Sequence, residues 1–145
     1  MADLGAIKNN CRKILTDELD NVGEDDDGDF FLTHESAVIW VSVSNATFAD
    51  QEVGRVSVFA HVVQELPKIH PDLALELLTS RAYLWGRWSC HKRDDKLYNL
   101  MFSIDMIGST LDAVELINAV SVVATVANDD DDDIVKKYGG KVMLS

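Results

Sequence analysis

The spacing of apolar residues changes twice along this chain, and each change limits the folds that it can adopt. From Leu4 to Leu19, apolar side chains recur every three or four positions, which is the spacing of one face of an amphipathic helix. Between Phe30 and Val63 the spacing becomes two, as in strands with one buried face. The helical spacing returns in Leu111–Ala127. The chain therefore combines helices with an antiparallel sheet.

Three strands are predicted in the first half of the chain. They cover Phe30–His34, Ala37–Ser44 and Arg55–Val63, and the turn residues between them favour hairpin connections, as in a meander. The face that we expect to pack against helices is aliphatic and consists of Ile39, Val41, Val43, Val56, Val58, Ala60 and Val62. The opposite face mixes aromatic side chains with serine and histidine.

A second helix and two further strands are predicted after this meander. Pro71 suits the first position of a helix, which we expect to continue to Trp85 and to stop at Gly86. The strands Arg87–His91 and Lys96–Ile104 follow, joined by a short polar turn.

The last predicted helix completes the order of elements. Ser109 and Asp112, three residues apart, form a capping box before Leu111–Ala127, and Gly139–Gly140 ends the C-terminal extension of this helix. The order is helix, three strands, helix, two strands, helix. We therefore expect residues 1–145 to form one α+β domain, with helices packed on one face of a five-stranded antiparallel sheet.

Negative charge is concentrated in two short segments. The chain has 25 acidic and 13 basic residues, a net charge of −12, which argues against binding to nucleic acid. Ten of the acids lie in Glu24–Asp29 and Asp129–Asp133. Because like charges repel, we expect both segments to lie in solvent, the second as a polar helix end or a bend between helical pieces. Their negative potential favours basic partner segments.

The first acidic segment does not have the spacing of a calcium loop. With Gly28 at the sixth position of an EF-hand loop, the first and twelfth positions are Gly23 and His34, where acidic ligands are needed. Weak cation binding by either acidic segment stays open.

Motifs for catalysis, cofactors, export and membrane insertion are missing from the sequence. GxGxxG, phosphate-loop, GxSxG and HExxH motifs do not occur, so we expect no catalytic residue, cofactor or built metal site. Cys90 and His91 are adjacent on a strand and point to opposite faces, which argues against a shared zinc ion. Cys11 and Cys90 form no CxxC pair and are expected to be reduced, buried thiols. Met1–Leu4 contains an acid where a signal peptide is basic, and Ala113–Ala127 is too short for a membrane span, so we expect a cytoplasmic protein without a membrane partner.

Trp40, Phe59 and His61 are the candidate binding residues. They lie on the strand face that helices are not expected to cover, next to serine side chains. Large aromatic side chains beside hydroxyl groups suit the recognition of another polypeptide. Two alternatives remain open: these residues bind a partner, or a terminal segment or a second copy of the chain in a homodimer covers them.

Three motifs carry a family resemblance. Leu66-Pro67 precedes the second predicted helix, and Gly86-Arg87-Trp88-Ser89 opens a strand. The third motif is the last helix, in which Val123-Ala124 is followed by Asp129, Asp132, Asp133, Ile134 and Tyr138-Gly139-Gly140. With these motifs in this order, the chain resembles the YbjN family over roughly residues 4–140, and within it the actinobacterial branch. That family is related in fold to type III secretion chaperones of the CesT kind.

The resemblance implies a small non-enzymatic domain that binds peptides or proteins, as a chaperone-like module or a sensory-transduction regulator. It implies no catalytic residues, and the matching positions Gly86, Arg87, Trp88, Gly139 and Gly140 are expected to be fold determinants. We expect an extended segment of a partner, whose identity the sequence does not name, to bind on apolar patches or at an open sheet edge. An adaptor that recognises one folded partner is the alternative, and an enzyme without a known signature is less favoured.

Overall fold

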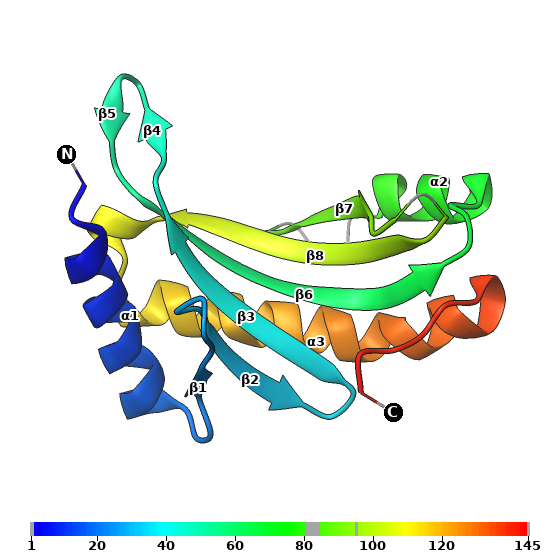
Figure 1. Ribbon diagram of the computed structural model, residues 1–145, viewed down its shortest axis with the longest axis horizontal. Coiled ribbons are helices and arrows are strands. Elements are labelled where there is room, and N and C mark those ends of the chain that lie inside the picture. Colours follow the sequence, from blue (N-terminus) through cyan, green and yellow to red (C-terminus); the bar gives the residue numbers. More distant parts are fainter. Residues whose placement is uncertain (1, 81–84, 95, 145) are drawn as a thin grey trace.

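The computed structural model describes residues 2–80, 85–94 and 96–144. Over these ranges one antiparallel sheet has the strand order β1-β2-β3-β6-β8-β7. Its strands are β1 (Gly23–Glu24), β2 (Phe30–His34), β3 (Ala37–Ser44), β6 (Arg55–Leu66), β7 (Arg87–Lys92) and β8 (Tyr98–Ile107). A separate hairpin of β4 (Thr47–Phe48) and β5 (Gln51–Glu52) projects from the sheet between β3 and β6 (Figure 1).

Two helices pack on one face of this sheet, and none of the described helices covers the opposite face, which is called the open face below (Figure 1). The long helix α3 (Ala113–Tyr138) contacts β3, β6 and β8, and α1 (Leu4–Glu18) contacts α3 and β3. The short helix α2 (Pro71–Thr79) lies near the C-terminal end of α3, where the ring centroids of His70 and Tyr138 are 5.6 Å apart. The predicted α+β class, with an antiparallel sheet and helices, is confirmed.

The sheet has six strands where five were predicted. The additional strand is β1, because Gly23 and Glu24 pair with Phe31 and Phe30. A pairing of two residues is too short to produce a period in the sequence. β6 continues to Leu66, beyond the predicted end at Val63, and β8 covers Tyr98–Ile107 where Lys96–Ile104 was predicted, because the two strands pair from Arg55 and Ile107 to Leu66 and Tyr98.

The helix-facing side of the sheet is the aliphatic side, as predicted. Val41, Val58 and Leu116 are each 0% exposed. All seven aliphatic residues predicted for this face are buried except Val43, which is half-buried. They form a hydrophobic cluster with α1 and α3, in which each fully buried large aliphatic side chain contributes about 1.5–3 kcal/mol.

Helix α2 is shorter than predicted. It begins at Pro71, but it ends at Thr79, and Ser80 has extended backbone angles. Within this helix only Leu73 is buried, whereas Leu78 is 82% exposed, so α2 lies largely at the surface. The remainder of the predicted helix includes residues 81–84, which lie outside the described residues.

The capping box predicted before the last helix is also wrong. Gly108–Thr110 is a 3-10 turn, and Asp112 is the N-cap residue of α3. The Asp112 carboxylate accepts a hydrogen bond from the Glu115 backbone N–H at 2.8 Å. Asp112 therefore takes the capping role predicted for Ser109, and the helix begins at Ala113.

The second acidic segment, Asp129–Asp133, lies inside α3 and does not end or bend the helix. Asp131 is 1% exposed, which contradicts the prediction that the whole segment lies in solvent. Its helical phase places it on the buried stripe with Ala127 and Ile134. The Ser36 hydroxyl, in the turn between β2 and β3, donates a hydrogen bond to the Asp131 carboxylate. Burial raises the pKa of Asp131, which the Ser36 hydrogen bond partly opposes.

The two cysteines differ in burial. Cys11 is buried in α1, and burial raises the pKa of its thiol to about 11. Cys90 is exposed, contrary to the prediction, because β7 is an edge strand of the sheet. Both thiols are free. Of the helices described, none is long and apolar enough to cross a membrane.

We expect Gly86→Ala to destabilise the fold by about 1–3 kcal/mol. A methyl group there would overlap the buried Phe102 ring and lie 3.0 Å from the Ser103 carbonyl oxygen. Gly5→Ala is the matched control, since the nearest atom to its added methyl, Asp3 Oδ1, is 3.4 Å away. Urea unfolding measures both variants, and equal stabilities for the two would contradict this interpretation of Gly86.

We expect Asp131→Asn to leave the free energy of unfolding at pH 7 unchanged or to raise it by up to about 1 kcal/mol. A raised pKa means that the folded state holds the Asp131 proton more tightly than the unfolded state does. The contribution of the Asp131 carboxyl group to folding stability is therefore greatest in acid. It falls as the pH rises from the pKa of this group in the unfolded state through its higher pKa in the folded state. The amide that replaces the carboxyl group is neutral throughout and can still accept the Ser36 hydrogen bond.

The exposed neighbour provides the control for this prediction. Asp132→Asn makes the same change of net charge outside the buried stripe. Urea unfolding gives the free energy of unfolding of each chain at pH 3 and at pH 7. The change in this free energy between the two pH values should differ from that of the natural chain more for Asp131→Asn than for Asp132→Asn. Identical pH dependence for both variants would contradict the burial argument.

Candidate binding surface

A row of aromatic side chains crosses the open face of the sheet. Phe31 in β2 is opposite Trp40 in β3, and Trp40 is opposite Phe59 in β6. Directly opposed residues point to the same side of a sheet, so the three rings form a continuous row. The ring centroids of Phe31 and Trp40 are 5.5 Å apart. All three side chains are half-buried.

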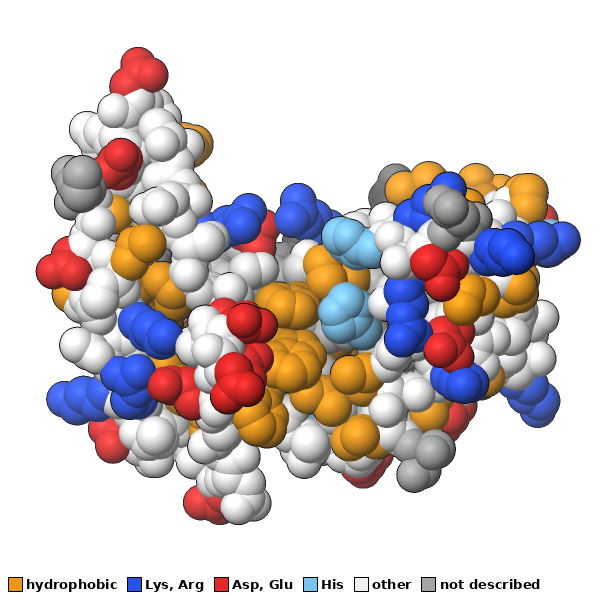
Figure 2. Space-filling model, viewed as in Figure 1, with side chains coloured by type: hydrophobic (Ala, Val, Ile, Leu, Met, Phe, Trp, Pro, Cys, Tyr) orange, Lys and Arg blue, Asp and Glu red, His pale blue; other side chains and the backbone are white. Residues whose placement is uncertain are grey.

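Trp40, Phe59 and His61 line a shallow hollow of about 400 Å³ on this face. His61 follows Phe59 by two residues, and the two ring centroids are 6.0 Å apart in an edge-on arrangement. The structure thus brings together the three residues that the sequence predicted as a binding site. Figure 2 shows hydrophobic side chains at the centre of this face, acidic side chains on one flank, and histidine and basic side chains on the other.

His61 belongs to the apolar part of the hollow rather than to its charged part. Its Nδ1 atom is buried and has no hydrogen-bond partner among the described residues. Burial lowers the pKa of His61, and the electrostatic effect of His91 lowers it further. Both effects favour the neutral imidazole, which contributes an aromatic surface to the hollow.

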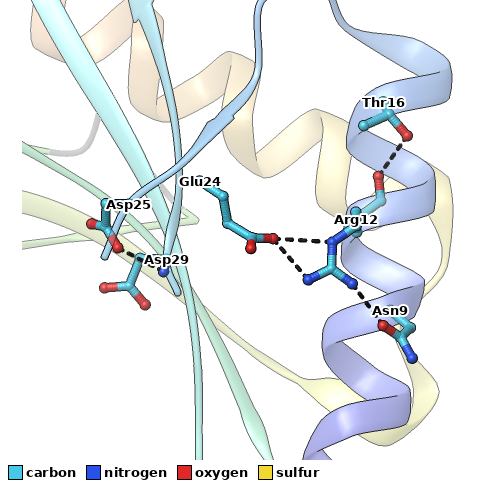
Figure 3. Close-up of polar contacts among 6 residues, drawn as sticks. All are labelled: Asn9, Arg12, Thr16, Glu24, Asp25 and Asp29. Carbon is cyan, nitrogen blue, oxygen red and sulfur yellow. Dashed lines mark hydrogen bonds and ion pairs between the residues drawn. The ribbon is translucent and has the colours of Figure 1, made fainter. Parts of the chain in front are cut away.

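The acidic flank is formed by the loop between β1 and β2, which is attached to α1 (Figure 3). Arg12 donates two hydrogen bonds to Glu24, at 2.8 and 3.0 Å. Asp25 accepts the Asp29 backbone N–H at 2.9 Å, which holds the turn closed. Both Asp25 and Asp29 line the hollow. Part of the first acidic segment is thus half-buried beside the aromatic row instead of lying wholly in solvent.

The opposite flank of the hollow is basic and is organised by Glu65. Arg93, which lines the hollow, and Lys141 each bind the Glu65 carboxylate at 2.9 Å. The Lys141 hydrogen bond and charge, followed by those of Arg93, lower the pKa of Glu65. Glu65 has a φ of 57°, and its backbone N–H donates to the Asn99 side chain at 3.2 Å. These contacts fix the end of β6 beside the hollow.

The motif residues of the sequence analysis do not gather at the hollow. Arg87 lies on the edge strand β7 and binds Asp105 at 3.0 Å. Trp88 points to the helix side, with its ring centroid 5.2 Å from that of Phe102. Gly139 caps α3 and, like Gly140, has a positive φ. The expectation that these positions determine the fold stays a prediction.

The sequence analysis did not single out several residues of this surface. Phe31 could have been found, because it alternates onto the face of Trp40 once the strand register is assumed. Arg93 and Met143, which line the hollow, give no comparable signal, since their positions depend on the end of β6 and on the C-terminal segment. In the part of the chain that the structure describes, no group of three or more His, Cys, Asp or Glu side chains could hold a metal ion.

Two solved structures share the fold of this chain. The structure is similar to the crystal structure of the ExsC–ExsE complex, with a TM-score of 0.59 and 12% identity over 91% of this chain and 96% of that chain. It is also similar to the Yersinia pestis type III secretion chaperone SycH in complex with a stable fragment of YscM2, with a TM-score of 0.53 and 12% identity over 85% of this chain and 98% of that chain. At this identity the likeness shows a shared fold.

The family follows from the sequence match. Residues 6–145 match the model of the family TY-Chap1, described as T3SS (YopN, CesT) and YbjN peptide-binding chaperone 1. The chain therefore belongs to this family, and the predicted relation to YbjN and type III secretion chaperones is confirmed. The assignment to an actinobacterial branch stays a prediction. No curated protein matches the chain.

Proposed function

We propose that this protein is a non-enzymatic, cytoplasmic, chaperone-like module that binds an extended segment of a partner protein in the hollow on the open face of the sheet. The observation that most supports this proposal is the aromatic row of Phe31, Trp40 and Phe59, whose side chains are half-buried on the sheet face opposite the helices. The description of the family as peptide-binding chaperones supports the proposal. ExsC and SycH were each solved with a polypeptide partner, which is consistent with it.

The hollow suits an extended polypeptide for two physical reasons. Its aromatic floor buries apolar side chains without requiring one particular shape, because rings offer large contact areas at low entropy cost. Its flanks have opposite charge, with Asp25 and Asp29 on one side and Arg93 on the other. This polarity favours one direction for a bound segment with a basic and an acidic end.

A second candidate function is an adaptor that recognises one folded partner or a second copy of this chain. The observation that favours it is a different surface, around α2. There, Leu75 and Leu78, which lie one turn apart on α2, are 63% and 82% exposed. An apolar patch of this kind suits a folded surface better than a single extended strand.

We expect the double variant Trp40→Ser, Phe59→Ser to lose at least tenfold in affinity for peptides, because aromatic anchors commonly contribute more than about 2 kcal/mol each. The probe is a pool of fluorescein-labelled 12-residue peptides of randomised sequence, screened against the natural chain, with affinities measured by fluorescence anisotropy. The variant should stay folded by circular dichroism, because neither ring belongs to the helix-facing core.

Two control variants make this experiment specific. Phe48→Ser removes an aromatic side chain that is 68% exposed on the β4–β5 hairpin, and it should leave peptide affinity unchanged. Leu75→Ser with Leu78→Ser removes the patch on α2. If the Trp40→Ser, Phe59→Ser variant binds peptides with the affinity of the natural chain, and only the Leu75→Ser, Leu78→Ser variant loses peptide binding, the hollow is not the binding site.

A further inference from the structure

The C-terminal segment 141–144 returns from the end of α3 to the open side of the sheet. Figure 1 shows it running back from α3, beside the end of β6, towards the turn between β2 and β3. Gln64 and Lys141 form an antiparallel bridge with two backbone hydrogen bonds, of 2.8 and 2.7 Å. The Leu144 N–H donates to the Ser36 carbonyl oxygen at 3.0 Å.

This segment pairs with an edge of β6 that the neighbouring strand leaves open. The register of β3 with β6 runs from Ser44 and Arg55 to Trp40 and Phe59. Beyond Phe59, the pairing of β6 within the described sheet continues with β8 alone. An unpaired strand edge is a template for another extended chain.

Two glycines place the segment against this edge. Gly139 and Gly140 have φ values of 89° and 88°, which favour glycine. A side chain at Gly140 would place its Cβ 2.7 Å from the Gln64 carbonyl oxygen. Only glycine therefore lets the backbone approach β6 closely enough for the bridge to form directly after the helix.

Two side chains of the segment lie at the hollow and at its basic flank. Lys141 binds Glu65 on the basic flank at 2.9 Å. Met143 lines the hollow together with Trp40 and Phe59, and the Gln64 side-chain amide contacts its sulfur atom. Methionine sulfur packs favourably against aromatic rings. The segment thus combines strand pairing, a charge contact and an apolar anchor.

The segment is held weakly compared with the core. Lys141 and Leu144 are exposed, and Val142 and Met143 are half-buried. Segments with few buried apolar contacts open at low free-energy cost. A competing chain can therefore displace it without unfolding the domain.

We propose that residues 141–144 act as a built-in competing ligand of the open face, and that the natural partner is an extended segment with the same chemistry. This inference rests on the proposed function of the hollow. The partner segment pairs with the backbone of Gln64, places a lysine or arginine against Glu65, and carries methionine or another unbranched apolar residue two positions later.

Tethering makes this competition effective even if the isolated segment binds weakly. A short flexible tether gives an effective concentration on the order of 1 mM. If the free segment has a dissociation constant of about 0.1 mM, the tethered copy lowers the affinity for a partner roughly tenfold. A partner must therefore bind tightly enough to displace the tethered segment before it can occupy the open face.

The test uses a fluorescein-labelled peptide with the sequence Gly-Gly-Lys-Val-Met-Leu-Ser, which is that of residues 139–145. Its binding is measured by anisotropy to the natural chain, to a chain truncated after Gly140, and to the full-length variant Lys141→Glu, Met143→Ser. We expect both altered chains to bind the peptide at least tenfold more tightly than the natural chain. Lys136→Glu, an equal charge change at an exposed position of α3, should behave as the natural chain does.

Peptides from the randomised pool separate this inference from the function on which it rests. If pool peptides bind the truncated chain at least tenfold more tightly than the natural chain, both proposals are supported. If they bind both chains equally, the competing-ligand inference is wrong and the peptide-binding function stands. If the truncated chain binds the residue 139–145 peptide but no pool peptide, the inference stands and the general peptide-binding function fails. If no peptide binds any chain, both proposals are wrong. If the truncated chain does not fold, the full-length variant Lys141→Glu, Met143→Ser takes its place in each of these comparisons.

Discussion

Helix α3 lies along the aliphatic face of β3, β6 and β8, and this packing determines what is left for every other surface. Leu116 and Val123 of the helix, with Val41 and Val58 of the sheet, are 0% exposed, and each square ångström of apolar surface removed from water stabilises the fold by about 25 cal/mol. Because α1 and α3 pack on one face of the sheet, the hydrophobic core forms without any cover on the other face. That independence lets Trp40 and Phe59 stay half-buried and accessible to a partner.

A buried polar contact links the core to the C-terminal segment. The Ser36 hydroxyl donates to Asp131, which lies on the buried stripe of α3, and the Ser36 carbonyl oxygen accepts the Leu144 N–H. Asn128 of the same helix donates to Glu35, so the turn between β2 and β3 is held at two adjacent residues. A single turn is thereby fixed to the helix on one side and offers an anchoring point for residues 141–144 on the other.

Residue spacing predicted the parts of the structure that depend on one buried face. The alternation in Ala37–Ser44 identified both the core side of β3 and the place of Trp40 on the opposite side, because period 2 fixes the direction of every side chain. The burial of Asp131 was missed because a run of like charges suggests solvent, whereas the phase of the helix decides its direction. The place of Met143 depends on a bridge between Gln64 and Lys141, and no local pattern encodes a contact so distant in the sequence. The candidate site was therefore predictable at its aromatic centre and not at its flanks.

The three tryptophans of the chain report on three different surfaces, which allows the peptide-binding claim to be measured directly. Trp40 lines the hollow, Trp85 is 78% exposed before the start of β7, and Trp88 packs against Phe102 on the helix side. In a ¹⁵N–¹H NMR titration with the tightest-binding pool peptide, the Trp40 indole signal should shift while those of Trp85 and Trp88 stay in place. A shift of the Trp85 or Trp88 signal with an unchanged Trp40 signal would contradict the account.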